Sequence, residues 1–394
     1  MKNVVIVSAV RTPIGKFLGG LASVKAPQLG GAAIKGALAQ AGVSPDAVDH
    51  VYFGNVLQAG IGQAPARQAA HAGGLPRSVG AITVNKVCGS GMRALMDAAN
   101  AVRVGEWDVV VCGGMESMSN APHLMHMRNG QKMGTAQLVD GMIHDGLWDA
   151  YGDKHMGSCA ELCAQKYNLS REEQDAFALQ SYERAQAAVN AGKFKSELVS
   201  VEVPQRKGDA LVVDADEEPF GAPLEKMGKL KPAFDRENGT ITAANASKLN
   251  DGASAMVVMS EEKAAELGLD PIARLISQGS FAHEPEWFTT APVGAMKQAI
   301  DRSGLKQNDV TRWEINEAFA NVTMAAMREL ELDASQVNVH GGAVALGHPI
   351  GASGARIVTT LLHALVQDGE KYGCAGICLG GGEGISVVVE NLKA

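Results

Sequence analysis

The sequence predicts an α/β protein with a largely parallel, helix-covered sheet, built from two similar halves. Three observations favour this fold class. Short β-branched runs alternate with helical patterns over most of the 394 residues, and motifs in the two halves resemble each other at nearly equal spacing. Glycine accounts for 46 residues, well above the typical share of about 7%.

The N-terminal part carries the first series of alternating elements. Apolar β-branched runs bounded by turn residues indicate buried strands, and apolar residues at helical spacing indicate the covering helices. We expect strands at 4–9, 51–56, 82–87 and 108–112, and helices at 29–41 and 90–102.

The C-terminal third repeats this alternation. The same patterns predict strands at 274–278, 312–315, 337–339, 376–379 and 385–389, and helices at 293–303, 318–330 and 354–365.

Two pairs of motifs indicate an internal duplication. A glycine-serine turn before an apolar helix occurs at 87–95 and again at 350–358, and a glycine run followed by glutamate occurs at 111–116 and 379–383. The offset is 263 residues from Gly91 to Gly354 and 267 from Glu116 to Glu383. Such near-equal offsets predict two copies of one supersecondary unit.

The middle of the chain has a different composition and is predicted to be an insertion packed over one half. Seven of the 16 methionines lie between Met115 and Met156, which favours adaptable core packing. Ser170 and Glu173 have the spacing of a helical capping box. We expect an N-terminal half at 1–118 and 251–270, an inserted loop domain at 119–250 and a C-terminal half at 271–394.

Composition excludes several function classes. A net charge of −8 without a basic stripe argues against nucleic-acid binding. No apolar run reaches the ~18 residues of a membrane span, and Arg11 ends the first apolar run too early for a secretory signal. Six cysteines are too sparse for a disulfide scaffold, so free thiols and a cytoplasmic location are expected.

Cys88 is the first candidate catalytic residue, because it lies where a strand is expected to end and a helix to begin. Free N–H groups at a helix start lower a thiol pKa and stabilise an oxyanion. The flanking Gly89 and Gly91 permit close approach of a substrate. A buried cysteine at a tight turn explains the same pattern without a catalytic role.

The same segment also fits a dinucleotide-binding fingerprint, with glycines and Ala94 at the required spacing and Asp108 near the expected acidic position. Asn85 and Lys86 in the preceding strand suit a buried nucleotide-binding strand poorly. Asp108 also begins the next strand instead of ending it.

Two further segments place a reactive side chain among glycines. His348 lies in a glycine-rich loop beside Pro349, which suits a general base, although a lone histidine is often structural. Cys378 ends a strand and precedes three glycines. A nucleophilic thiol, a base and a second thiol suit acyl transfer followed by removal of a proton from carbon.

The whole chain resembles the thiolase family, with the family's motifs in the family's order. The motifs that carry this resemblance are Val10–Gly15, Asn85–Gly91, Gly113–Ser119, Asn245–Gly252, Asn316–Phe319, Gly347–Gly354 and the glycine run after Cys378.

The resemblance implies an acetyl-CoA acetyltransferase that joins two acetyl-CoA molecules into acetoacetyl-CoA and catalyses the reverse thiolysis. It implies that Cys88 takes the acyl group after His348 activates its thiol, and that Cys378 removes the α-proton of the second substrate. The N–H groups of Cys88 and Gly380 would form one oxyanion hole, and His348 with a water held by Asn316 the other. No metal or redox cofactor is implied; coenzyme A thioesters are the substrates.

The family fold implied is a five-layer αβαβα sandwich of two duplicated βαβαβαββ halves plus an inserted loop domain that binds coenzyme A. The resemblance also implies a homotetramer built from dimers, and bulky Phe288 favours a short acyl pocket. Other residues that match substrate-lining positions are His155, Met156, Ser247, Ala243, Ala318 and Phe319.

Several alternatives remain open at this point. A 3-ketoacyl-CoA thiolase of fatty-acid β-oxidation, with broad chain length, is the nearest rival, and Cys378 argues against a decarboxylating ketoacyl synthase. An NAD-dependent oxidoreductase and a catalytically inactive CoA-binding scaffold represent other classes. His340 and Glu383 depart from the family pattern, and an inward-facing His340 would alter the protonation of the site.

Overall fold

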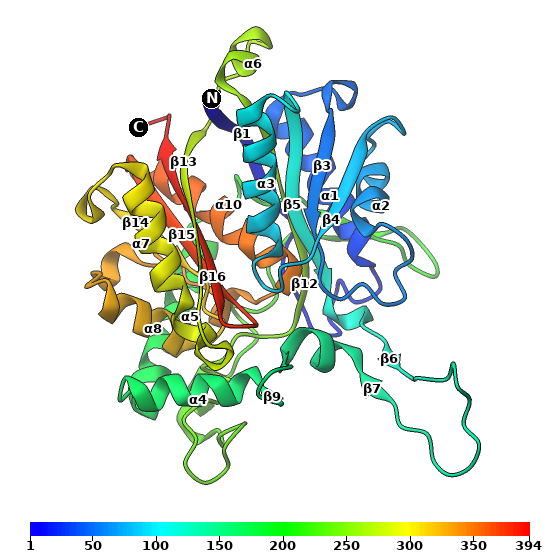
Figure 1. Ribbon diagram of the computed structural model, residues 1–394, viewed down its shortest axis with the longest axis vertical. Coiled ribbons are helices and arrows are strands. Elements are labelled where there is room, and N and C mark those ends of the chain that lie inside the picture. The colour runs from blue at the N-terminus through cyan, green and yellow to red at the C-terminus, as the bar shows by residue number, and fades with distance from the viewer.

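The computed structural model describes residues 1–394 and shows two halves with similar element order, although the C-terminal half has no counterpart of the third N-terminal strand (Figure 1). The N-terminal half contains β1 (Val4–Arg11), α1 (Ala26–Ala41), β3 (His50–Gly54), α2 (Pro65–Ala72), β4 (Gly80–Val84), α3 (Ser90–Val104), β5 (Val109–Ser117) and β12 (Asn250–Ser260). The C-terminal half contains β13 (Ala273–Ala282), α7 (Ala291–Ser303), β14 (Arg312–Ile315), α8 (Ala320–Glu329), α9 (Ala343–Leu346), α10 (Ile350–Asp368), β15 (Tyr372–Leu379) and β16 (Glu383–Asn391).

The strands follow one path, β14-β15-β16-β13-β1-β12-β5-β3-β4, with short β2 (Gly15–Lys16) beside β12. The halves join through β1 and β13, which pair only at Val5–Arg274 and Ile6–Ala273. Only β3–β4, β3–β5 and β14–β15 are parallel. The prediction of a largely parallel sheet was therefore wrong: β12 and β16 close each half in antiparallel register and make the sheet mixed.

The elements stack in five layers. Helices α1 and α2 cover the outer face of the N-terminal strands, and α7 covers the outer face of the C-terminal strands. Between the two sets of strands lie α3 and α10, which pack against each other (Figure 1). The expected five-layer αβαβα sandwich of two halves is confirmed.

The two central helices cross at the duplicated glycines. A Cβ atom on Gly91 would lie 2.8 Å from the backbone nitrogen of Ala355, and one on Gly354 would lie 2.6 Å from the backbone nitrogen of Met92. Backbone fills the space that a side chain would need at either position. The repeated glycine therefore allows the start of each helix to pack on the other.

Three element predictions need correction. The strand expected at 82–87 ends at Val84, so Asn85–Gly89 forms a turn. The strand expected at 337–339 is reduced to one bridge between Val337 and Trp313. β12 was not predicted as a strand. Its first residues are polar and small, but Asn250, Asp251 and Ser254 are fully buried and hydrogen-bonded to distant segments.

The residues between β5 and β12 pack over both halves instead of one. Helices α4 (Met156–Lys166) and α5 (Arg171–Asn190) contact α8 and α9, whereas β10 (Val201–Val203), paired with β11 (Leu211–Val213), joins the apolar core beneath α1. The capping box of α5 is confirmed: Ser170 and Glu173 exchange side-chain to backbone hydrogen bonds.

A long arm between β6 (His123–Leu124) and β7 (Val139–Asp140) projects from the body of the molecule (Figure 1). Met125, Met127 and Met133 are exposed on it, so the expectation that methionines of this region fill the core is wrong for these three. Met115, Met118, Met142 and Met156 are buried as expected.

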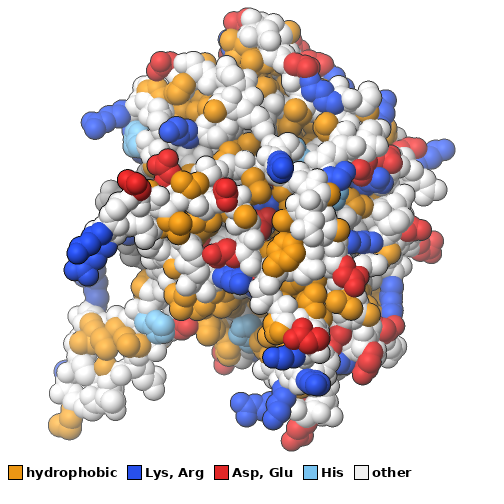
Figure 2. All heavy atoms as spheres, turned by 180° about the vertical axis from the view of Figure 1, so that it is seen from behind, with side chains coloured by type: hydrophobic (Ala, Val, Ile, Leu, Met, Phe, Trp, Pro, Cys, Tyr) orange, Lys and Arg blue, Asp and Glu red, His pale blue; other side chains and the backbone are white.

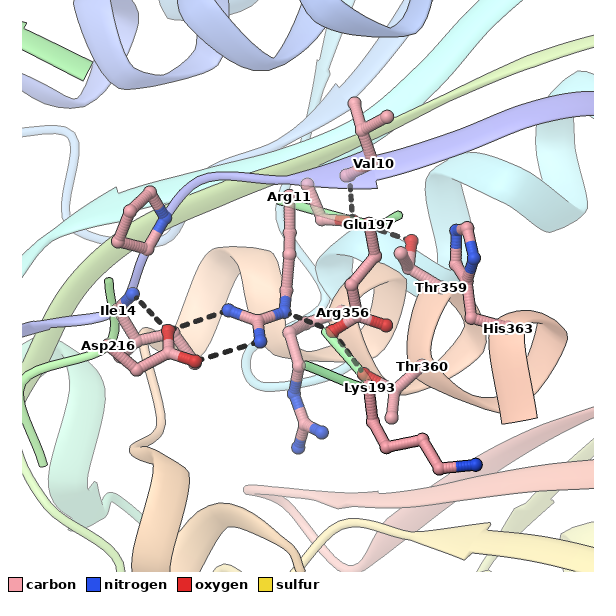
Figure 3. A network of polar contacts seen from close by, with 12 residues as sticks. Val10, Arg11, Ile14, Lys193, Glu197, Asp216, Arg356, Thr359, Thr360 and His363 are labelled. Carbon is pink, nitrogen blue, oxygen red and sulfur yellow. Dashed lines mark hydrogen bonds and ion pairs between the residues drawn. The ribbon is translucent and has the colours of Figure 1, made fainter. Parts of the chain in front are cut away.

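A buried ionic network ties the insertion to both halves (Figure 3). Arg11 at the end of β1 donates to Glu197 at 2.5 Å and to both carboxylate oxygens of Asp216 at 2.7 and 2.9 Å. Glu197 also accepts from Thr360 on α10. Charged side chains are rarely fully buried unless paired in this way, so this network fixes where the insertion meets the body.

None of the helices combines the length and apolar character needed to cross a membrane.

Candidate active site

The turn that carries Cys88 is shaped by Ser90, the first residue of α3. The backbone N–H of Lys86 donates to Ser90 Oγ at 2.8 Å, and the Ser90 hydroxyl donates to the Val87 carbonyl at 2.6 Å. These bonds hold Val87 at a φ of +46°, which is an outlier for a β-branched residue. Such strain persists only where the surroundings enforce it, and here it sets the position of Cys88.

Burial dominates the electrostatics of the Cys88 thiol. It raises the pKa of Cys88 to about 12, although the N–H groups of Cys88 and Gly380 act in the opposite direction. The expectation that the start of α3 lowers this pKa was therefore wrong, because the cost of desolvating a thiolate exceeds the gain from the two donors.

His348 lies in the loop between α9 and α10. Its backbone N–H donates to Asn250 Oδ1 at 2.8 Å, and its ring Nδ1 lies 2.6 Å from Ser353 Oγ. The Ser353 hydroxyl already donates to the Pro349 carbonyl, so its oxygen accepts a hydrogen bond from a protonated His348 Nδ1. This arrangement leaves Nε2 unprotonated, and burial followed by the charge of Arg356 lowers the pKa of His348 to about 3.

Asn316 follows β14 and faces that free nitrogen. Its backbone N–H donates to the Gly376 carbonyl at 3.0 Å, and its Nδ2 lies 3.5 Å from His348 Nε2. The Oδ1 atom of Asn316 is buried without a protein partner. A buried acceptor of this kind suits an ordered water molecule.

Cys378 is the next-to-last residue of β15 and is fully buried. Its thiol has a pKa well above the usual range, raised first by burial and then by proximity to Cys88. The segments that carry the two thiols touch, because a Cβ atom on Gly89 would lie 2.5 Å from Leu379 and one on Gly380 would lie 3.6 Å from Val87. The apolar cluster that contains Cys378 includes four residues expected to line the substrate path, namely Met156, Phe288, Ala318 and Phe319.

A pocket of about 310 Å³ opens beside these groups and has His348 in its wall. Its other predicted lining residues are His155, Ala243, Ser247 and Phe319. The His155 ring stacks on Phe234 with centroids 4.7 Å apart, and the Ser247 N–H donates to the Ala318 carbonyl. Largely apolar walls with a few polar groups are typical of a site for a small organic ligand.

Not every predicted residue reaches this pocket. Met156, Ala318 and Phe288 lie behind its wall in the cluster of Cys378. No hydrogen bond joins Cys88 to His348; Cys88 instead packs against Met142 and Ile350, which line the pocket.

The two residues that depart from the family pattern lie elsewhere. His340 packs edge-on against Phe194 at 6.0 Å and is absent from the pocket wall. Glu383 forms an ion pair with Lys86 at 2.5 Å.

Sequence reasoning missed Lys248, whose ammonium donates to the Ala246 carbonyl at 2.7 Å and lies over the Tyr182 ring. It lines the pocket, and burial lowers its pKa to about 8. A long charged side chain inside the otherwise small and uncharged run 243–250 was the available signal. Met142, Phe234, Leu249 and Ile350 were also missed, because apolar residues of the insertion resemble ordinary core.

No cluster of three or more histidine, cysteine, aspartate or glutamate side chains offers a site for a metal ion. Asp108, the acidic residue of the dinucleotide-binding alternative, pairs with Lys2 on the surface at 2.9 Å.

Comparisons with known proteins identify the family of the chain. Residues 4–262 match the family model for the thiolase N-terminal domain, and residues 269–391 match that for the thiolase C-terminal domain. The chain belongs to the thiolase family.

Relatives and a solved structure extend over the whole chain. An acetyl-CoA acetyltransferase from Cupriavidus necator is 53% identical, with 99% of this chain and 100% of the relative covered. A mitochondrial acetyl-CoA acetyltransferase from Bos taurus is 50% identical, with 100% and 92% covered. The crystal structure of Acat5 thiolase from Ascaris suum in complex with coenzyme A has a TM-score of 0.94 and 45% identity, covering 99% of this chain and all of that one.

Proposed function

We propose that this protein is an acetyl-CoA C-acetyltransferase, which condenses two acetyl-CoA molecules into acetoacetyl-CoA and coenzyme A and catalyses the reverse thiolysis. The observation that carries the proposal is the contact between the segments that carry Cys88 and Cys378, next to a pocket with His348 in its wall. Full-length relatives at about 50% identity that are named acetyl-CoA acetyltransferases support it.

The first half-reaction acylates Cys88. The free Nε2 of His348 takes the thiol proton as sulfur attacks the thioester carbonyl, and the N–H groups of Cys88 and Gly380 stabilise the oxyanion. When the intermediate collapses, Cys378 gives its proton to the departing coenzyme A sulfur. The enzyme then holds an acetyl group on Cys88, an imidazolium and a Cys378 thiolate.

The second half-reaction forms the carbon–carbon bond. The Cys378 thiolate removes an α-proton from the second acetyl-CoA, while the His348 imidazolium and a water on Asn316 stabilise the enolate oxygen. The enolate carbon attacks the acetyl group, the bond to Cys88 breaks, and His348 returns its proton to that sulfur. All three groups regain their initial protonation states.

Two variants test the roles of the thiols. Cys88→Ala should form no acyl-enzyme with acetyl-CoA when the intact protein is weighed by mass spectrometry. Cys378→Ala should still be acetylated but should not condense. Normal condensation by Cys378→Ala would contradict the second-thiol role, and an inactive wild-type protein that still bound coenzyme A would favour the scaffold alternative.

The preference for short acyl chains is supported by Phe288, which is buried beside Cys378 and Phe319 and limits the space behind the reacting thiol. Thiolysis of four-carbon and ten-carbon 3-ketoacyl-CoA substrates tests this preference. Comparable kcat/KM on both would favour the alternative, a broad 3-ketoacyl-CoA thiolase of fatty-acid β-oxidation.

Coenzyme A binding is assigned to the loop domain at 119–250. Support comes from the pocket, because His155, Ala243 and Ser247 all belong to this segment and line it. Titration of coenzyme A into Ser247→Trp should show weaker binding, and unchanged affinity would argue against this path.

We also propose a homotetramer, a dimer of dimers, in the cytoplasm. Exposed apolar residues on the β6–β7 arm, among them Met133 and Leu138, support association; Figure 2 shows hydrophobic atoms along this projection at the lower left. Edge strand β4 exposes Ile82. Six free cysteines agree with a reducing compartment. Light scattering of the purified protein and fractionation of cells would test these two assignments.

A further inference from the structure

The two loops that present N–H groups to the Cys88 sulfur touch along three successive contacts. A Cβ atom on Gly89 would lie 2.5 Å from Leu379, and one on Gly380 would lie 3.6 Å from Val87. Beyond them, Lys86 Nζ and Glu383 Oε2 form an ion pair at 2.5 Å. Figure 1 shows the turn between β15 and β16 beside the start of α3. The ion pair is thus the outermost contact between these loops.

The C-terminal loop is held by backbone contacts at its ends: Glu383 pairs with Leu379 and Ala282, and the Gly382 carbonyl accepts from the His283 N–H at 2.9 Å. Gly380, Gly381 and Gly382 connect β15 to β16, and the last two have φ values of +88° and +79°. Without side chains these residues have wide conformational freedom, so the place of the Gly380 N–H depends on how the ends of the loop are held. Leu379 holds one end in the core, and Glu383 is the first residue beyond the other.

The N-terminal loop is restrained at a matching point. Lys86 directly precedes Val87, the residue with the strained φ of +46°, and Cys88 follows. An ion pair from Lys86 to Glu383 therefore connects the residue before the strained turn to the residue after the glycine run. The side chains of the pair are only 26% and 33% exposed, so solvent and salt screen their attraction in part.

We propose that Lys86 and Glu383 are positioning residues that hold the N–H groups of Cys88 and Gly380 at the separation needed to stabilise the acylation oxyanion. This inference rests on the proposed acylation of Cys88. Partly exposed ion pairs contribute little to stability, whereas oxyanion stabilisation depends steeply on donor position. The effect should therefore fall on the rate of acylation and hardly on folding.

A nearby ion pair provides the matched control. Arg93 and Asp97 on α3 also pair at 2.5 Å, with side chains 36% and 27% exposed. Both belong to one helix, so their attraction fixes no distance between the two loops. Removing that pair should leave acylation unchanged.

The experiment compares Lys86→Met, Glu383→Gln, the double variant Lys86→Met/Glu383→Gln and the control Arg93→Met. Acylation by acetyl-CoA is followed by rapid quench and intact-protein mass spectrometry, alongside kcat and KM for thiolysis. We expect each single variant to acylate about 10-fold more slowly, with KM within about 2-fold, since the lost interaction acts in the transition state. The double variant should be no slower than the single ones.

Two further measurements distinguish a positioning role of the ion pair from a contribution to folding stability. The charge-swapped variant Lys86→Glu/Glu383→Lys should recover at least half of the lost rate. The thermal midpoint of every variant should stay within about 2 °C of the wild type, as expected for a partly exposed pair.

Acylation within about 2-fold of wild type in both single variants would overturn the proposal. Losses that multiply in the double variant would overturn it as well, because independent effects are not those of a pair. If Arg93→Met slowed acylation equally, the slow acylation would come from the loss of any nearby charge, and this outcome would also overturn the proposal. Absence of acyl-Cys88 in the wild type would contradict the proposed function itself, and this inference with it, whereas slow acylation confined to the variants would not.

Discussion

The two halves of the molecule repeat the same junction, a turn leading into a central helix, but use it differently. At the offset that aligns Gly91 with Gly354, the residue equivalent to Cys88 is Gly351. The Gly351 N–H donates to Glu116 at 3.0 Å, and a Cβ atom there would lie 2.5 Å from the Met115 carbonyl. The C-terminal junction is therefore closed by packing, whereas the N-terminal one carries a thiol that faces the N–H of Gly380.

The duplicated glutamates show the same contrast. Glu116 is fully buried and accepts hydrogen bonds from Asn55, Val56 and Gly351. Its equivalent, Glu383, reaches across to Lys86 instead. Each glutamate thus contacts the turn of the opposite half. In the proposed mechanism, a duplicated scaffold forms a single site because one turn carries the nucleophile, Cys88, and the other carries the base, His348.

The largest expected effect comes from removing that base. His348→Ala should lower the kcat of thiolysis roughly 10³-fold, because a positioned general base contributes about 10²–10⁴ in rate. Steady-state thiolysis of acetoacetyl-CoA measures the loss.

His340→Asn is the matched control, since His340 packs against Phe194 outside the pocket wall. It should stay within about 3-fold of wild type, given that its ring contacts no reacting group. A large loss of kcat in His340→Asn, or a small loss in His348→Ala, would contradict the assignment of the general base to His348.

The next largest effect is a difference in the free energy of unfolding between variants of Glu116 and of Glu383. Glu116→Ala should lower the free energy of unfolding by roughly 3 kcal/mol or more, because several buried donors lose their acceptor. Glu383→Ala should cost about 0–1 kcal/mol, as for other partly exposed pairs. Urea unfolding monitored by circular dichroism compares the two, and equal losses would contradict the contrast.

The contribution of Glu116 should also depend on pH. Burial raises the pKa of Glu116 to about 7 in the folded protein from an ordinary value of 4.5. Between these values the folded state keeps a proton that the unfolded state has lost, so stability falls as pH rises through this window. Glu116→Ala should remove this part of the pH dependence, and an unchanged profile would show that Glu116 is not its source.

Much of this arrangement could be predicted from the sequence because glycine and reactive residues occur together. In the runs around Cys88, His348 and Cys378 the backbone lies close to other groups. Only glycine permits such close approach, so its presence in the sequence indicates it. Strand β14 was predicted at its observed bounds, since apolar residues and Trp313 form a short run between turns.

The remainder depended on long-range contacts that local patterns do not contain. β12 starts with Asn250 and Asp251, which look like loop residues until their buried partners are known. The net pKa of Cys88 depends on how far burial outweighs the N–H groups of Cys88 and Gly380, which the local sequence does not contain. Lys86 and Glu383 are 297 residues apart, and no periodicity pairs them.

A smaller effect is expected where the two central helices cross. Gly91→Ala and Gly354→Ala should each lower the free energy of unfolding by about 1–3 kcal/mol, the usual cost of overpacking, because a methyl group at either site meets backbone. Gly228→Ala, with no neighbour within 4 Å, should have no such effect. A loss in only one crossing variant would show that the pseudo-symmetric contact is unequal.

The last prediction leaves the stability of the protein unchanged and decides whether burial or the start of α3 governs the pKa of the Cys88 thiol. Only the thiolate reacts with iodoacetamide, and a pKa near 12 leaves the thiol protonated throughout ordinary buffers. In a Cys378→Ala background, which removes the second thiol, alkylation of Cys88 should accelerate about tenfold per pH unit from pH 7 to 10 without levelling off. A plateau below pH 8 would instead show a resident thiolate. That result would mean that the donors of this junction outweigh burial, and it would make His348 unnecessary for the first proton transfer.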